Sequence, residues 1–387
     1  MARGVRHFPR LRPWASIFCH LRGLMAHGAR SGDNKRVKTL HLIVDAAQLE
    51  TATAQEALDR AAGILRAGGL VALPTETVYG LGANALDRTA VERIFAAKSR
   101  PAWDPIIVHI ASVAMLEGLV EEVPAAARRL MEHFWPGPLT LLLPRAAAVP
   151  DVVTAGRRLV GVRMPAHPVA LGLIRRAGVP VAAPSANRFG HISPTTAQHV
   201  LDDLDGRIDA VVDAGPSARG VESTVLDPAT TPMTIYRPGA VTAEQIREVT
   251  GAVEMYRSGE ALRETPAEAL PSPGVGIRHY APRARLVLVE AALAELGTRL
   301  AEMVRGMHGE RVGVMLPGDV DVPGGLAECR MVAWGAWSRP DEMARDLYAG
   351  LRTLDQERCT VILCPLPAAE GIGAAIRDRL KKAGRKV

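Results

Sequence analysis

The chain has 387 residues, which is enough for two domains of roughly 150 residues each. Hydrophobic residues make up 48% and aromatic residues only 4%, so the expected cores are aliphatic. The net charge of +6 favours anionic partners such as nucleotides or nucleic acid, although an arginine-rich genome gives the same excess. Apolar runs stay well short of the ~20 residues of a membrane span, and the four cysteines include no pair with metal or redox spacing. These features predict a protein of a reducing compartment, the cytoplasm, without a membrane contact.

Residues 1–38 differ from the rest of the chain. Six arginines precede the first acidic residue, Asp33. This pattern is typical of an organellar transit peptide, but an overextended translation start, with Met25 as the true start, accounts for it equally well. We favour the second reading and expect a disordered basic extension that activity does not require.

Residues 39–250 show alternating strand and helix patterns. Two consecutive strands, 221–226 and 233–236, have no helix between them, so part of the sheet should be antiparallel. The predicted strands span residues 41–44, 70–73, 106–110, 139–143, 160–163, 179–183, 210–213, 221–226 and 233–236. The predicted helices span residues 53–67, 88–98, 125–134, 169–176, 196–204 and 243–249.

Residues 251–283 are rich in proline and glycine and read as a linker. The linker ends in Arg278-His279-Tyr280, which a passive spacer does not need, so we expect it to fold over a ligand cavity as a lid. Residues 284–387 then alternate strand and helix again. The predicted elements are strands 285–289, 312–316, 330–333 and 360–363 and helices 291–307, 341–354 and 372–381, which make a smaller three-layer α/β domain.

The first candidate site follows the buried strand at residues 70–73. Thr75, Glu76 and Thr77 come directly after it, and Gly80 and Gly82 allow a close backbone approach. Open α/β sheets bind ligands at such strand ends. An ordinary strand-to-helix loop fits the same residues.

Two cations close the predicted helix 88–98. Lys98 and Arg100 precede Pro101, which ends the helix, and we expect both at an exposed helix end. Together they suit the phosphates of a nucleotide triphosphate. Taken alone, the pair is more simply explained as a favourable charge at a helix C-terminus.

Polar side chains also follow the strand at residues 179–183. Ser185 and Asn187 can hold a phosphate, a ribose or a metal-bound water, or merely form a turn. Ser193 is either a further ligand contact or a helix cap.

Arg163 ends another apolar strand, where its charge needs a partner, either a substrate carboxylate or an internal acid. Ser223 and Arg237 add a hydroxyl and a further cation. The sequence has no zinc-protease motif, no serine nucleophile elbow and no Walker A loop. A basic, hydroxyl-rich cavity without a nucleophile predicts catalysis by positioning and charge neutralisation.

Ten motifs, taken together, resemble the YrdC-type threonylcarbamoyl-AMP synthases in their long, two-domain form. The resemblance covers roughly residues 40–387. The motifs are PTETVYGLG (74–82), AKSRP (97–101), PIIVHI (105–110), WPGPLTLLL (135–143), VRMPAHP (162–168), APSAN (183–187), SPT (193–195), VESTV (221–225), RPG (237–239) and PGVGIRHYAP (273–282).

The resemblance implies a YrdC-like twisted mixed sheet around a large basic cavity, joined by the linker to a smaller Rossmann-like domain. It implies that L-threonine, bicarbonate or carbon dioxide, and ATP with Mg²⁺ give threonylcarbamoyl-adenylate and pyrophosphate. A partner complex then transfers the threonylcarbamoyl group to the adenosine next to the anticodon of tRNAs that read ANN codons.

The same resemblance assigns residues. The implied threonine contacts are Thr77, His109, Arg163, Ala183 and Ser223. The implied ATP contacts are Arg100, Asp104, Leu159, Ser185, Ser193, Arg237 and Tyr280, and the implied catalytic set around the phosphates is Lys98, Arg100, Ser185 and Asn187. Two positions depart from the family pattern: Asp104 stands in place of an asparagine, and Leu159 in place of a threonine.

Two other functions compete with this one. A non-catalytic module of the same fold would use the basic cavity for double-stranded RNA or tRNA, but the retained Lys98, Arg100, Ser185 and Asn187 favour the enzyme. The related domain of hydrogenase-maturation carbamoyltransferases accompanies paired-cysteine zinc fingers and an acylphosphatase domain, and this chain has neither.

Overall fold

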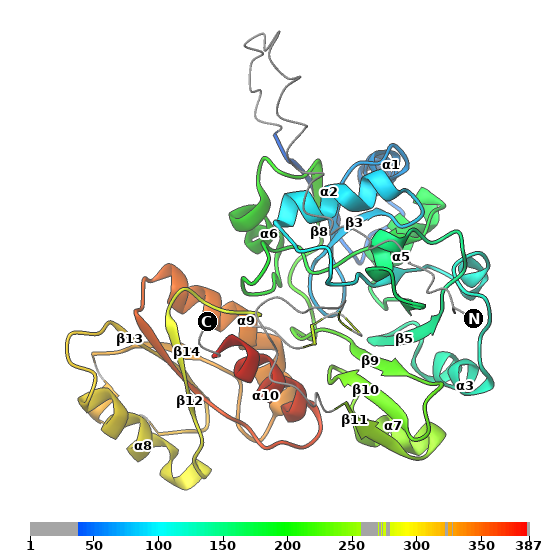
Figure 1. The fold of residues 1–387 in the computed structure, drawn as a ribbon. Coiled ribbons are helices and arrows are strands. Elements are labelled where there is room, and N and C mark those ends of the chain that lie inside the picture. The colour runs from blue at the N-terminus through cyan, green and yellow to red at the C-terminus, as the bar shows by residue number, and fades with distance from the viewer. Residues whose placement is uncertain are drawn as a thin grey trace, which may run out of the picture. The chain divides into compact units, whose positions relative to one another are not determined.

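The structure is a computed structural model that describes residues 38–256, 270, 272, 274–275, 279–321, 324–326 and 328–384. The basic extension therefore lies outside the described residues. The described residues form an 11-stranded sheet and a 4-stranded sheet, both accompanied by helices (Figure 1). This confirms the predicted α/β fold. We call residues 38–256 the N-terminal part and residues 284–384 the C-terminal part. The domain boundaries themselves stay a prediction.

The N-terminal part contains the larger sheet. Its strands are β1 (Leu40–Ile43), β2 (Val71–Leu73), β3 (Gly80–Asn84), β4 (Val108–His109), β5 (Leu139–Pro144), β6 (Leu159–Arg163), β7 (Val181–Ala182), β8 (Ala210–Asp213), β9 (Thr224–Asp227), β10 (Met233–Arg237) and β11 (Val253–Met255). Its helices are α1 (Ala52–Arg66), α2 (Arg88–Lys98), α3 (Ala125–Phe134), α4 (Asp151–Thr154), α5 (Pro168–Ala177), α6 (Ala197–Leu204) and α7 (Ala243–Thr250), with a 3₁₀ turn at Val113–Leu116.

The larger sheet is mixed, with the strand order β1-β8-β2-β3-β7-β4-β6-β5-β9-β10-β11. Strands β9 and β10 pair antiparallel, as predicted from the missing helix between them. Strand β3 was not predicted, because its glycines read as a loop. Gly82 is needed there, since a Cβ would lie 2.8 Å from Val181 and 2.9 Å from Leu73. Strand β11 lies in the predicted linker but pairs with β10.

Local sequence signals explain where helix α2 begins and ends. The side chain of Asp87 accepts hydrogen bonds from the backbone N–H groups of Thr89 and Ala90, which is the N-cap that an aspartate before a helix commonly forms. The helix ends at Ser99, which has a left-handed φ of 53°. Ile94 points into the core and is fully buried.

The C-terminal part contains the smaller sheet, which is parallel in the order β12-β15-β13-β14. Helices α9 and α10 pack on one of its faces and α8 on the other, as parallel sheets require (Figure 1). No helix among the described residues is both long and apolar enough to cross a bilayer. The elements are β12 (Arg285–Val289), α8 (Leu293–Arg305), β13 (Val312–Leu316), a 3₁₀ turn (Gly324–Leu326), β14 (Arg330–Ala333), α9 (Pro340–Gln356), β15 (Val361–Pro365) and α10 (Ile372–Ala383).

One apolar cluster contains residues of both parts. Val221 and Ile192 of the N-terminal part belong to it together with Tyr348 of α9 and Ile376 of α10. Tyr280, at the end of the predicted linker, belongs to the same cluster. Burial of this shared apolar surface stabilises the contact between the two parts.

The tight packing around Gly239 generates a stability prediction. A Cβ at this position would overlap the backbone of Glu222, Ser223 and Thr224. We expect Gly239→Ala to lower the free energy of unfolding by ~1–3 kcal/mol, the usual cost of overpacking. Gly63, inside helix α1, has room for a Cβ, so Gly63→Ala should raise it by ~0.5–1 kcal/mol. Denaturant unfolding of both variants checks the prediction, and a stable Gly239→Ala protein would contradict it.

Candidate active site

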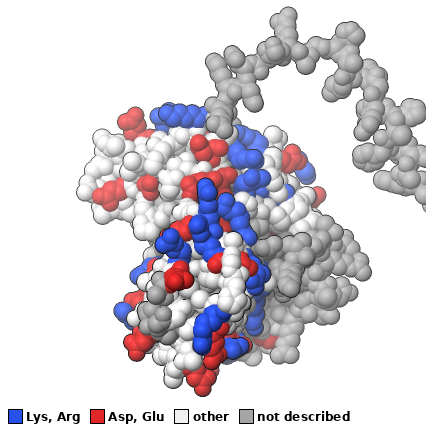
Figure 2. Space-filling view, turned by 90° about the vertical axis from the view of Figure 1, so that its left-hand side faces the viewer, with Lys and Arg blue, Asp and Glu red and all other residues white. Residues whose placement is uncertain are grey.

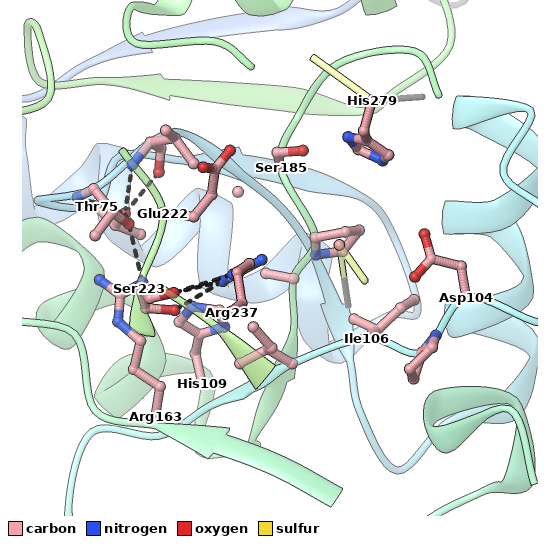
Figure 3. A pocket seen from close by; sticks show the side chains of 18 of the residues that line it. Thr75, Asp104, Ile106, His109, Arg163, Ser185, Glu222, Ser223, Arg237 and His279 are labelled. Carbon is pink, nitrogen blue, oxygen red and sulfur yellow. Dashed lines mark hydrogen bonds between the residues drawn. The ribbon is translucent and has the colours of Figure 1, made fainter. Parts of the chain in front are cut away.

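A cavity lies where the loops that follow strands of the larger sheet meet the end of the predicted linker (Figure 3). Most of the sequence-predicted site residues line it: Thr77, Arg100, Asp104, His109, Arg163, Ala183, Ser185, Ser223, Arg237 and Tyr280. Four predicted residues are not part of the lining: Lys98, Leu159, Asn187 and Ser193.

The strand register explains why these residues converge. His109 of β4 lies beside Arg163 of β6 and opposite Val181 of β7. Side chains alternate along a strand, so Ile107 and His109 both face the cavity while Val108 packs in the core. The sheet therefore supplies one wall, and the loops supply hydroxyls and cations above it.

Arg163 holds three partners while lining the cavity. Its Nη1 donates to Thr77 Oγ1 at 2.9 Å, its Nε donates to the Gly137 carbonyl at 3.2 Å, and its Nη2 lies 2.6 Å from Glu76 Oε1. The internal acid that the sequence left open as an alternative is thus Glu76. The pair is buried, and it fixes the guanidinium in one orientation toward the cavity.

His109 is neutral at physiological pH. Burial, together with the nearby Arg163 charge, lowers its pKa from 6.5 to about 3. Its Nδ1 has no hydrogen-bond partner among the described residues. A buried neutral imidazole with a free nitrogen can hydrogen-bond a substrate without adding charge.

Arg237 differs from the other two arginines of the lining. Its Nε and Nη2 donate to the Ser223 carbonyl at 3.1 and 2.9 Å, and Nη2 donates to Ser223 Oγ at 3.1 Å. It makes no ion pair with any described carboxylate, whereas Arg100 pairs with Asp104 at 2.9 Å and Arg163 pairs with Glu76. Arg237 is therefore the lining arginine that has no carboxylate partner among the described residues.

Asp104, the first departure from the family pattern, is tied to Arg100. Besides this ion pair it accepts a hydrogen bond from the backbone N–H of Gly274. Burial raises its pKa above the usual value, although Arg100 and Lys98 oppose that shift. The negative charge that this departure adds to the lining is thus matched by a neighbouring cation.

Lys98 is not at an exposed helix end, so that expectation is wrong. Its side chain is 1% exposed, and Nζ donates to the carbonyls of Ser185, at 2.5 Å, and of Asn187. The chain after β7 crosses the end of α2, where the Phe189 N–H donates to the Lys98 carbonyl at 2.9 Å. Burial, followed by the Arg100 charge, places the pKa of Lys98 well below its usual value. Arg100 is buried as well.

Three predicted residues act outside the lining. Asn187 uses its Nδ2 within its own loop, donating to the carbonyls of Arg188 and His191 at 2.8 Å each. Ser193 donates to Glu222 Oε1 at 2.7 Å. Leu159, the second departure, begins β6, far along the strand from Arg163, and packs in an apolar cluster.

The end of the predicted linker reaches the cavity. Gly274, His279 and Tyr280 line it, while residues 257–269, 271, 273 and 276–278 lie outside the described residues. Tyr280 has a left-handed φ of 64°, which is uncommon for a residue with a Cβ. Its hydroxyl lies next to Gly274: a Cβ added to Gly274 would be 2.8 Å from the Tyr280 hydroxyl oxygen. Both ring nitrogens of His279 lack a hydrogen-bond partner among the described residues.

Sequence reasoning missed the importance of Glu222. This buried carboxylate lines the cavity and accepts hydrogen bonds from Ser193, from Tyr348 of α9 and from Arg379 of α10. Its position before two hydroxyl residues was the only sequence signal. Tyr348 and Arg379 lie on amphipathic helices, where nothing in the sequence distinguishes them from ordinary core and surface residues.

The described residues include no group of three or more His, Cys, Asp or Glu side chains placed to hold a metal ion. The two carboxylates of the lining, Asp104 and Glu222, are each paired with an arginine. Mg²⁺ prefers a few carboxylates plus substrate phosphates. Asp104 Oδ1 is the lining carboxylate oxygen that lacks a hydrogen-bond partner among the described residues, so it is the protein atom that would suit such an ion.

The environment of Glu222 generates a pH prediction. Burial raises its pKa, but Arg379 and Arg237 outweigh burial and lower it from 4.5 to about 2. A lowered carboxyl pKa stabilises the fold above pH 4.5, by on the order of 3 kcal/mol, and this stabilisation is lost as the pH falls toward 2. The midpoint temperature of thermal unfolding should thus change less between pH 4.5 and 2.5 in Glu222→Gln than in the wild type. The same dependence of the midpoint temperature on pH in both proteins would contradict the prediction.

Two family models match the chain. Residues 63–239 match the one described as telomere recombination, and residues 241–384 match the C-terminal domain of threonylcarbamoyl-AMP synthase. The threonylcarbamoyl-AMP synthase of Pyrococcus abyssi is 43% identical over 325 residues, which cover 84% of this chain and 92% of that protein. That of Bacillus subtilis is 42% identical over 349 residues, covering 90% of this chain and 98% of that protein.

A solved structure agrees with these relatives. The crystal structure of P. abyssi Sua5 complexed with L-threonine superimposes with a TM-score of 0.81 at 40% identity, and the match covers 89% of this chain and 98% of that chain. Similarity of this extent, in sequence and in fold, shows that the chain belongs to the threonylcarbamoyl-AMP synthase family.

Proposed function

We propose that the cavity condenses L-threonine, bicarbonate or carbon dioxide, and ATP into L-threonylcarbamoyladenylate and pyrophosphate. The observation that carries this proposal is the division of the cavity. His109, Arg163 and Ser223 lie together on one side, and Asp104 and His279 lie on the other (Figure 3). Such a division suits two substrates that bind next to one another. Family membership supplies the identity of both.

The Arg163 side suits the amino acid. The α-carboxylate of threonine is the natural partner of a buried guanidinium whose orientation Glu76 and Thr77 already fix. The hydroxyls of Thr77 and Ser223 can read the threonine side chain, neutral His109 can hydrogen-bond it, and the backbone at Ala183 closes this side. The relative from P. abyssi binds L-threonine in its crystal structure, which supports this proposal.

The other side suits ATP. Arg100, Ser185, Arg237 and Tyr280 are the proposed contacts, with Asp104 balanced by Arg100. We propose supporting roles for the residues outside the lining: Lys98 and Asn187 shape the loop that carries Ser185. Ser193 acts through Glu222. Leu159 contributes only apolar packing.

The chemistry needs positioning and charge neutralisation more than a nucleophile from the protein. The ammonium group of threonine loses a proton to solvent, and the free amine then adds to carbon dioxide. This step forms a C–N bond and releases a second proton to solvent, which gives a carbamate. A carbamate oxygen attacks the α-phosphorus of ATP in line, and the bond to pyrophosphate breaks. Mg²⁺ on the phosphates and the free charge of Arg237 would offset the negative charge that develops.

The linker end supports a role as a lid. Gly274, His279 and Tyr280 already line the cavity, and closure over the substrates would exclude water, which hydrolyses the mixed anhydride. We propose that the adenylate then passes, in the cytoplasm, to a complex that modifies the adenosine next to the anticodon of tRNAs reading ANN codons.

The alternative of a non-catalytic RNA module gains no separate support from the face of the molecule drawn in Figure 2. On the face drawn in Figure 2, Lys and Arg side chains gather near the middle, but Asp and Glu side chains lie among them. A backbone-reading surface would present a more uniform positive charge.

The direct test supplies purified protein with ¹⁴C-bicarbonate, ATP, Mg²⁺ and threonine. We expect a labelled, alkali-labile adenylate and an equal amount of pyrophosphate, and we expect neither when threonine is omitted. A protein that binds tRNA tightly but makes no adenylate under any of these conditions would overturn the proposal.

Arg163 generates a prediction about substrates. Threoninamide should be a much poorer substrate than threonine, because it lacks the charge that Arg163 binds. Serine lacks the methyl group of threonine, so its transition state should be bound more weakly by ~1–3 kcal/mol. Arg163→Gln should raise the KM for threonine about 10–100-fold, since a hydrogen bond to a charged group is worth ~1.5–3 kcal/mol. Initial rates of pyrophosphate release measure all three. Equal rates with threonine and threoninamide would rule out this role.

A further inference from the structure

Glu222 is a buried carboxylate in the wall of a cavity that receives a polyanion. Glu222 and Arg237 both line this cavity (Figure 3). The charge of Arg237 acts to lower the pKa of Glu222, and the charge of Glu222 acts to raise the pKa of Arg237. Without a partner of its own, Glu222 would repel a triphosphate and draw Arg237 toward itself, because opposite charges interact strongly away from water. The Arg237 side of the cavity can therefore bind a triphosphate only if another cation neutralises Glu222.

The C-terminal part supplies that cation. Arg379 of α10 is 1% exposed, and its Nε donates to Glu222 Oε2 at 2.7 Å. Tyr348 of α9 donates to the same carboxylate, with its hydroxyl 2.9 Å from Oε2. The Arg379 guanidinium also lies over the ring of Tyr280, 5.3 Å from its centre, so one side chain contacts both Glu222 and a cavity-lining residue.

The charges around Arg379 cancel. Its Nη1 lies 2.6 Å from Asp378, and Asp378 is also paired with Lys382 at 2.7 Å. The two carboxylates, Glu222 and Asp378, are matched by the two cations, Arg379 and Lys382. Arg237 is then the surplus charge of this group.

We propose that Arg379 is a positioning residue of the nucleotide site: it neutralises Glu222 and thereby keeps Arg237 available for the phosphates of ATP. The C-terminal part is, on this account, a component of the nucleotide site and not only an appended domain. This inference rests on the proposed function, because it assumes that ATP occupies the Arg237 side of the cavity.

A charge-rescue experiment tests the proposal. The full-length chain is titrated calorimetrically with a non-hydrolysable ATP analogue and Mg²⁺. We expect Arg379→Gln to weaken binding at least tenfold, because it exposes the Glu222 charge. The double variant Arg379→Gln/Glu222→Gln, in which that charge is removed, should regain most of the lost affinity. Arg379→Lys, which keeps the charge, should stay within about threefold of the wild type.

A second buried ion pair between the two parts gives the matched control. Arg352 of α9 lies 2.8 Å from Asp203 of α6, and both side chains are buried. Arg352→Gln removes an ion pair of similar burial that involves neither Glu222 nor Arg237. It should lower the thermal midpoint while leaving the affinity for the analogue unchanged.

The outcomes separate the two proposals. If Glu222→Gln fails to restore binding to Arg379→Gln, or if Arg352→Gln weakens binding equally, Arg379 acts only through the stability of the fold and the inference is wrong. If Arg379→Gln binds the analogue like the wild type, the inference is also wrong, but the proposed function stands. If the wild type binds no analogue at all, the proposed function fails together with the inference.

Discussion

Charge buried out of water is the constraint on which this site depends. An isolated ion inside a protein is unfavourable by several kcal/mol unless another charge or a set of hydrogen bonds compensates it. The cavity wall obeys this rule residue by residue: Arg163 has Glu76, Arg100 has Asp104, and Glu222 has Arg379. Arg237 is held by the carbonyl and hydroxyl of Ser223. These pairs fix the shape of the cavity and decide which cation an incoming anion meets.

The same pairing ties the two parts of the chain together. The Glu222 carboxylate accepts a hydrogen bond from the Ser193 hydroxyl within the N-terminal part. It also accepts hydrogen bonds from the Arg379 guanidinium and the Tyr348 hydroxyl of the C-terminal part. Tyr280 stacks on Tyr348, with ring centres 5.8 Å apart, so the end of the linker is packed against α9 at the same place. A change in how the two parts pack would be transmitted directly to the cavity wall.

Much of this architecture is predictable from local sequence. Helix α2 is marked by Asp87 and Pro101, and the polar residues after the strands, such as Thr77 and Ser185, do line a cavity. These features follow from signals a few residues long. Arg163 at a strand end was recognisable for the same reason, since a charge beside an apolar strand requires a partner.

The remainder depends on contacts between distant segments. Strand β3 forms because Gly82 fits against Val181, about a hundred residues away, and no local propensity encodes that fit. Lys98 is buried because the loop after β7 covers the end of its helix. The roles of Glu222 and Arg379 are also set by the fold, since 157 positions separate the two residues in the chain. In each case the partner that determines the role lies outside any window in which a motif is read.

The position of Arg379 on the last helix has a consequence for biosynthesis. The residues of the larger sheet, together with Thr77, Arg163 and Arg237, are synthesised well before α10. Until that helix docks, Glu222 lies in the cavity wall without its guanidinium, and the apolar cluster around Val221 is uncovered. A nascent chain would thus carry nearly all the side chains that line the cavity while the charge of Glu222 lacks its guanidinium partner. If Arg379 has the proposed role, nucleotide binding would strengthen only after α10 has docked.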